Sequence, residues 1–221
     1  MRYRLHPNVS FCLVSGRVVF LDLSADRYFC LSIPAERTFL RSIQGSELDS
    51  GEDALLARLT ASGPLSCDRS HPPAIPCPAV AELRASLLDE PLLRPTLPGI
   101  CLAAASLFAA PVRLRTLGLN GAIRQLSRRK RRARLRSVGK DRLLRAVTGY
   151  VRLRDIVTEN DNCLVRSMAV ANGLISAGAT PQLIMGVKLQ PFAAHAWVQC
   201  EDWLVNERWD VVRDFTPILV V

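Results

Sequence analysis

The 221-residue sequence has only three histidines and no closely spaced pair of cysteines. Its seven cysteines form no CxxC pattern, so a disulfide framework and a structural zinc site with paired ligands are both disfavoured. The sequence also lacks a GxxxxGK phosphate loop, a GxGxxG fingerprint and an HExxH helix. Nucleotide, hydride-transfer and zinc-hydrolase chemistry therefore have no sequence support, and we expect no cofactor and no metal.

Hydrophobic runs are also short. The amino-terminal stretch MRYRLHPNVS lacks the apolar segment of a signal peptide, which together with free thiols predicts a cytoplasmic protein. The longest uncharged run, residues 95–112, is shorter than the roughly 20 apolar residues that a membrane span needs, and it contains three prolines. We expect this run to form a buried, alanine-rich helix, and we expect no membrane association.

Positive charge is concentrated in one segment. Residues 124–145 hold eleven Lys or Arg against one acid, Asp141, so this segment accounts for the whole net charge of +9. Such a run forms a solvated helix face, docks the acidic part of a partner, or binds phosphates non-specifically. It lacks the interleaved aromatic residues and base-contacting motifs of a specific nucleic-acid site, so nucleic acid is the least favoured partner.

The amino-terminal part alternates between short apolar stretches and turn residues. VSFCLV, RVVFLDL and RYFCLS, within residues 9–33, predict a three-stranded antiparallel meander. Two or three helices follow; one starts at Pro34 and stops at Gly45, and another stops at Gly63. Residues 66–79 are rich in proline and indicate a linker. We therefore predict a small domain over residues 1–65.

The second predicted domain covers residues 80–221 and is mostly helical up to residue 159. A helical pattern then begins at Cys163 and stops at Gly178 and Pro181. Three strand-like segments follow, LIMGVKL, HAWVQC and WLVN. The fold class predicted for the whole chain is α+β.

Cys163 is the first candidate for chemistry. Asn160, Asp161 or Asn162 can cap the helix that it begins, and the positive end of that helix lowers a thiol pKa. A lone cysteine on a helix is nevertheless more often a small buried residue. The placement suits a nucleophile but does not identify one.

The scarcity of histidine narrows the search for a base. His6 lies near the terminus and His71 in the predicted linker, which leaves His195. Strand alternation places Cys200 on the face opposite His195, which disfavours a zinc site made of Cys163, His195 and Cys200.

A cysteine–histidine pair also needs an acceptor that orients the imidazole, and Asn206, Glu207 and Asp210 are the candidates. A two-residue turn at residues 201–202 would place Asp210 opposite His195. A three-residue turn would instead place Glu207 on the face of His195. The sequence leaves both possibilities open.

The order of CLVRSMAVANGLISAG, AHAWVQ and the terminal RDFTPILVV is similar to the transglutaminase-like cysteine peptidase of lasso-peptide biosynthesis, the B-protein family, over about residues 80–221. VVFLDLSADRYFCLS resembles the winged-helix-like precursor-recognition element (RRE) that is fused ahead of that peptidase. The resemblance implies a papain-like α+β peptidase domain behind a small domain of three strands and helices. It also implies two partners, a precursor peptide and an asparagine-synthetase-like cyclase.

The resemblance further implies roles for individual residues. Cys163 would attack a leader-peptide bond, and His195 would move the proton. Glu207 occupies a position where the family usually has Asp, so Asp210 is kept in reserve as the third member. The leader would join the small domain as an added strand along the third strand of the meander. The receiving residues would be Tyr28, Phe29, Cys30 and Leu31.

Two alternatives remain open at this point. The chain could be an inactive scaffold that only binds the leader, for which the Glu at position 207 is the one hint. It could also bind nucleic acid through residues 124–145.

Overall fold

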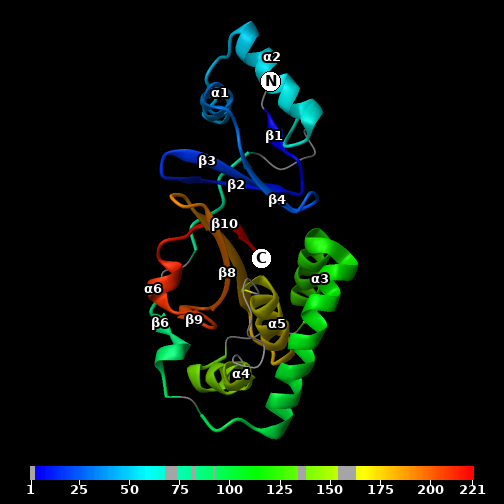
Figure 1. The fold of residues 1–221 in the computed structure, drawn as a ribbon, viewed down its shortest axis with the longest axis vertical. Helices are drawn as coiled ribbons and strands as arrows, with labels where there is room; N and C mark the ends of the chain where they lie inside the picture. Colours follow the sequence, from blue (N-terminus) through cyan, green and yellow to red (C-terminus); the bar gives the residue numbers. More distant parts are fainter. Residues whose placement is uncertain (1–2, 68–73, 81–82, 92, 134–137, 154–162) are drawn as a thin grey trace. The chain divides into compact units, whose positions relative to one another are not determined.

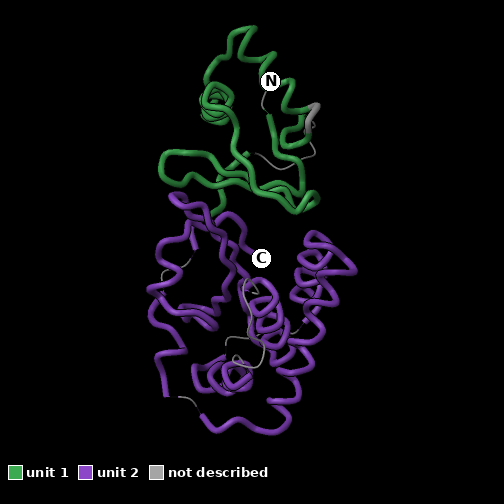
Figure 2. Tube along the Cα trace, in the orientation of Figure 1, with its two compact units in different colours: residues 1–78 green, residues 79–221 purple. Residues whose placement is uncertain are grey.

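The computed structural model describes residues 3–67, 74–80, 83–91, 93–133, 138–153 and 163–221. The chain forms two compact units, residues 1–78 (unit 1) and 79–221 (unit 2) (Figures 1 and 2). Unit 1 comprises β1 (Arg4–Leu5), β2 (Val9–Val14), β3 (Arg17–Asp22), β4 (Arg27–Cys30), α1 (Ile33–Ile43), α2 (Ser50–Ser62) and β5 (Leu65–Ser66). Unit 2 comprises β6 (Ala85–Ser86), η1 (Leu87–Asp89), α3 (Leu97–Arg132), α4 (Lys140–Leu153), α5 (Cys163–Ser176), β7 (Pro181–Lys188), β8 (Ala193–Cys200), β9 (Trp203–Leu204), α6 (Trp209–Val212) and β10 (Thr216–Val220). The predicted α+β class is confirmed.

The predicted meander is present in unit 1 as the antiparallel sheet β2-β3-β4. Ser15 and Gly16 have φ values of 49° and 73°, and two positive φ values in succession are what a tight type I′ hairpin turn requires. The ring of Phe20 lies 5.6 Å from Phe11 and 5.2 Å from Phe39 of α1, measured between centroids. These contacts fix the sheet against the first helix.

Unit 1 has two helices, which agrees with the two or three predicted. Pro34 lies in the first turn of α1, and Gly45 leaves that helix with a φ of 82°. The α2 helix begins with a capping box, in which Asp49 accepts from the Glu52 N–H at 2.7 Å and Glu52 accepts from the Asp49 N–H at 3.1 Å. Gly63 ends it in the left-handed conformation.

Part of the segment interpreted as a linker packs on unit 1. Ala74 is buried in the core of that unit, and the Cys77 N–H donates to the Phe11 carbonyl at 2.8 Å. Proline-rich composition disfavours helices and central strands, yet such a segment can lie along a sheet edge and bury its apolar residues. The structure therefore divides the chain after Pro78. His71 lies outside the described residues.

Unit 2 is built on a sheet with the strand order β10-β7-β8-β9-β6. The β7 and β8 strands pair antiparallel from Pro181 opposite Cys200 to Lys188 opposite Ala193. The α5 helix packs on these two strands, and α3 and α4 pack on α5 (Figure 1). The helix predicted from Cys163 and the three strand-like segments are confirmed, whereas β6 and β10 were not predicted.

The expectation that residues 95–112 form a buried helix is half wrong. Residues 97–112 of this run lie in α3, which continues past Pro111, is interrupted by non-helical angles at Gly118 (φ 65°, ψ 175°) and ends at Arg132. Only 17% of its most apolar window is buried. Periodicity predicts a helix, but it does not tell how many neighbours cover it. By length and composition alone, α3 is the one helix among the described residues that could cross a membrane.

Candidate functional site

The α5 helix begins with Cys163, which is partly buried. The positive end of the helix dipole therefore lies at the thiol. Residues 160–162, predicted to cap this helix, lie outside the described residues.

The β8 strand brings His195 to that thiol. The imidazole Nε2 lies 2.9 Å from the Glu207 Oε2, and His195 is also hydrogen-bonded to the Cys163 side chain. Both partners are well shielded, because the His195 and Glu207 side chains are 16% and 19% exposed. The Phe215 ring packs beside the imidazole with a centroid distance of 5.4 Å. The structure thus brings Cys163, His195 and Glu207 together in one chain of hydrogen bonds.

The hairpin after β8 does not place Asp210 where strand alternation predicts it. The two-residue turn forms, with Cys200 opposite Trp203, and that turn was expected to place Asp210 opposite His195. Asp210 is instead exposed in α6. The expectation required a regular strand up to residue 210, but β9 ends at Leu204. Beyond it the chain turns, and this turn carries Glu207 to the imidazole.

The Asn206 side chain forms hydrogen bonds to β8 and α5 just after the end of β9. Its Oδ1 accepts from the Val198 N–H at 2.8 Å, and its Nδ2 donates to the Ser167 Oγ at 2.9 Å. The buried Ser167 hydroxyl donates in turn to the Ala196 carbonyl at 2.8 Å. Asn206 therefore ties the cysteine helix to the histidine strand and does not orient the imidazole. Sequence reasoning missed Ser167, whose only signal is its position one turn after the cysteine.

Ser86 holds the backbone beside the carboxylate. Its hydroxyl donates to the Glu207 carbonyl at 2.7 Å, and the side chain is buried. Ser86 belongs to β6, which pairs in parallel with β9. No signal in the sequence could have identified this residue, because it lies 121 positions before Glu207.

The electrostatics of the three groups favour charge separation. Burial raises the pKa of the Cys163 thiol, but the hydrogen bond and charge of His195 and the backbone of Ala196 and Leu164 outweigh it, so the pKa lies below its usual value. Burial lowers the pKa of His195, but its bonds to Cys163 and Glu207 raise it to about 9. Burial raises the pKa of Glu207, yet the bond to His195 holds it below its usual value. A thiolate beside an imidazolium is the form of an activated cysteine nucleophile.

We expect Glu207→Gln to lower the pKa of His195 from about 9 toward the usual histidine range, because the carboxylate stabilises the imidazolium. Asp210→Asn should leave the pKa unchanged, since Asp210 is exposed in α6. NMR titration measures both variants, and a chain with three histidines keeps the assignment simple. A larger change in Asp210→Asn would transfer the orienting role to Asp210.

Other predicted residues are not brought together. Cys200 is buried and its backbone pairs with Pro181 and Trp203. Across the described residues, no three His, Cys, Asp or Glu side chains converge as a metal site would require. The zinc set of Cys163, His195 and Cys200 is therefore not assembled.

The predicted leader-binding residues lie in and after β4 of unit 1. Phe29 and Leu31 pack in the core of the unit, whereas Cys30 is exposed and Tyr28 is partly buried. This alternation follows from the pleat of the strand. Among the described strands, β4 pairs with β3 alone.

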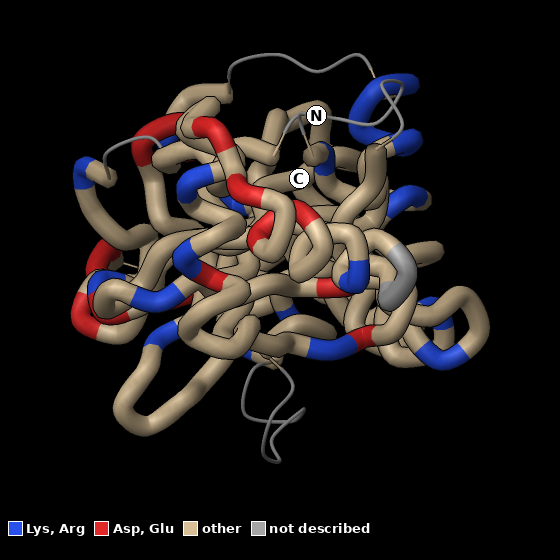
Figure 3. The backbone as a smooth tube through the Cα atoms, turned by 90° about the horizontal axis from the view of Figure 1, so that it is seen from above, with Lys and Arg blue, Asp and Glu red and all other residues tan. Residues whose placement is uncertain are grey.

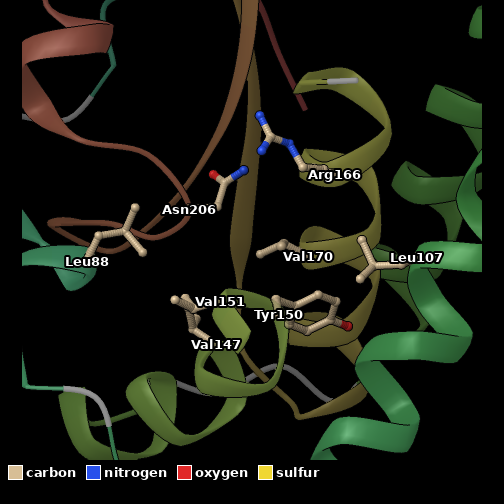
Figure 4. Close-up of a pocket in the computed structure, with 8 residues that line it drawn as sticks. All are labelled: Leu88, Leu107, Val147, Tyr150, Val151, Arg166, Val170 and Asn206. Atoms are coloured by element: carbon tan, nitrogen blue, oxygen red, sulfur yellow. The ribbon is translucent and has the colours of Figure 1, made fainter. Parts of the chain in front are cut away.

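A pocket lies on the side of α5 that carries Cys163, and its lining begins one helical turn after that residue. Cys163, Arg166 and Val170 are spaced three and four residues apart and so share one helix face. Arg166 and Asn206 lie at one end of the pocket, and Tyr150 lies toward the other (Figure 4). The remaining lining residues are apolar, namely Leu88, Leu107, Val147, Val151 and Val170. An apolar recess with a cationic end thus begins one helical turn from the candidate nucleophile.

The geometry agrees with a comparison of the sequence with known families. The pattern of the Transglutaminase-like superfamily matches residues 104–220, more than half of the chain. The protein therefore belongs to the Transglutaminase-like superfamily, which includes cysteine proteases. The match contains Cys163, His195 and Glu207. Comparisons with curated proteins and with solved structures give no match.

Proposed function

We propose that the protein is a cysteine peptidase that removes the leader from a ribosomally made lasso-peptide precursor in the cytoplasm, so that a separate cyclase can close the ring. The observation that carries the proposal is the hydrogen-bonded chain from Cys163 through His195 to Glu207. Its nucleophile lies at a helix start, and the pKa of the thiol is held below its usual value. This arrangement serves acyl transfer by a thiol.

The reaction on this proposal has two stages. The Cys163 thiolate attacks the carbonyl carbon of the scissile bond, and the His195 imidazolium protonates the departing amine. Water then attacks the thioester, giving its proton to His195 and releasing the new carboxylate and the thiol. Glu207 holds the ring in place throughout and stabilises its charged form.

Unit 1 supplies the leader-binding surface on this proposal. An edge strand offers unpaired backbone groups that an extended peptide can bind. The β2 edge is partly occupied, because the Cys77 N–H donates to the Phe11 carbonyl. The β4 edge has no partner strand among the described residues, which favours it as the receiving edge. Tyr28 and Cys30 would then flank the leader from one face of the sheet, while Phe29 and Leu31 support β4 from the core.

The leader should slow amide hydrogen exchange in β4 (Arg27–Cys30) and leave the β2 edge unchanged. Added backbone hydrogen bonds protect amides from exchange, and only the edge that gains the leader forms new ones. Exchange followed by mass spectrometry, with and without a synthetic leader peptide, measures this. Protection centred on β2 would place the leader at the opposite edge of the sheet.

Incubation with a precursor peptide, followed by mass spectrometry of the products, tests the proposed reaction. A single cut at the leader–core junction is expected. Leader binding without any cut would show an inactive scaffold and overturn the peptidase proposal.

A further inference from the structure

The first half of α3 exposes an apolar stripe. Leu97, Cys101, Ala105, Phe108 and Val112 are all exposed and follow one another at intervals of three or four residues, so they lie along one side of the helix. Leu97 is 78% exposed, Phe108 is 75% exposed and Val112 is 59% exposed. Large apolar side chains at this exposure, in a continuous row, indicate an interaction surface.

The same region carries positive charge alone. Residues 91–140 contain twelve Lys or Arg and no Asp or Glu. Two of these cations serve the fold: Arg129 donates to Asn172 and to Ser176 of α5, and Lys140 pairs with Glu90. Arg128, Arg131 and Arg132 are exposed on α3. At the right-hand edge of Figure 3, where α3 lies, the charged segments are Lys or Arg.

We propose that α3 docks unit 2 on an anionic membrane surface. The apolar stripe would enter the boundary between headgroups and acyl chains, and the arginines of the second half would bind lipid phosphates. An apolar row and a cationic, acid-free segment, which follow one another along the sequence on either side of Gly118, are the combination that an anionic bilayer attracts. A second copy of the chain fits less well, because two such cationic surfaces repel each other.

The helix lies on the membrane and does not cross it. Its other side packs in unit 2, where Ala103, Leu107 and Ala110 are buried, and α3 packs on the helix that begins with Cys163. If α3 spanned the bilayer, these buried residues would lose their contacts with the rest of unit 2. The inference replaces the expectation of no membrane association, which depended on the burial of residues 95–112.

Co-sedimentation of the full chain with vesicles tests the proposal. We expect binding to vesicles of phosphatidylcholine mixed with phosphatidylglycerol, and weaker binding at high salt. Leu97→Gln combined with Phe108→Gln should weaken binding by about tenfold for each side chain. Ile75→Gln, which changes an apolar residue of unit 1 that is 64% exposed, should have no effect. Circular dichroism checks that each variant is folded.

A charge variant separates the two contributions. Replacing Arg128, Arg131 and Arg132 with Gln should weaken binding to the anionic vesicles by about a hundredfold. Absence of vesicle binding in the unaltered protein overturns the proposal, as does binding that the Leu97 and Phe108 variants leave unchanged. Binding to an acidic peptide such as polyglutamate, with no binding to vesicles, overturns it as well and identifies a protein-docking surface.

Discussion

Cys163→Ala is expected to abolish cleavage of a precursor peptide, with a loss in rate of about 10⁶-fold, the scale seen when a nucleophile is removed from a catalytic triad. On the proposed reaction Cys163 supplies the nucleophile, and its hydrogen bond to His195 places it for proton transfer. Mass spectrometry of the reaction over hours measures the loss. Leader affinity should stay unchanged, because the proposed leader surface belongs to unit 1.

Cys67→Ala provides the matched control, since Cys67 is exposed and lies in the other unit. It should cleave at the rate of the unaltered protein. Cleavage by Cys163→Ala at the full rate would remove the cysteine from the mechanism, and with it the proposed reaction.

Gly173→Ala is expected to lower the free energy of unfolding by about 3 kcal/mol, although alanine usually favours a helix over glycine. A Cβ at this position of α5 would lie 1.9 Å from the Tyr150 hydroxyl oxygen and 2.8 Å from the carbon that bears it. Either the buried Tyr150 ring or the α5 helix would have to shift, and a shift of α5 would move Cys163 with it. Denaturant unfolding measures the stability loss, and the cleavage assay reports the displacement.

Two further variants test this steric explanation. Gly139→Ala should change stability little, because its Cβ would meet no atom within 4 Å. Tyr150→Phe removes the nearest clashing atom, so it should recover part of the stability lost in Gly173→Ala. A double variant as unstable as Gly173→Ala alone would place the clash elsewhere.

The candidate site could be predicted from the sequence as far as local rules extend. Three histidines in the chain, two of them in unfavourable positions, were enough to select His195 as the partner of Cys163. The acid that orients His195 was left open between Glu207 and Asp210. Side chains alternate between the two faces of a sheet only while the strand continues. The β9 strand ends after two residues, and side-chain hydrogen bonds of Asn206 replace the ladder.

Burial and long-range contacts were harder to predict. The helical period of residues 95–112 predicted a helix, but hydrophobicity could not show that α4 and α5 cover only one side of it. The proline-rich segment was interpreted as a linker because composition does not reveal that Ala74 packs in a core. The contact of Ser86 with Glu207 joins two segments that share no pattern, and only the folded sheet brings them together.

The Ser86 contact has an evolutionary consequence. Ser86 fixes the backbone of Glu207, so the distance from that backbone to the imidazole is set by β6 and must be spanned by a side chain of matching length. A shorter carboxylate would reach His195 only if the anchoring strand moved inward. Positions 86 and 207 should therefore covary among relatives: the choice of Glu or Asp at position 207 should depend on the residue at position 86.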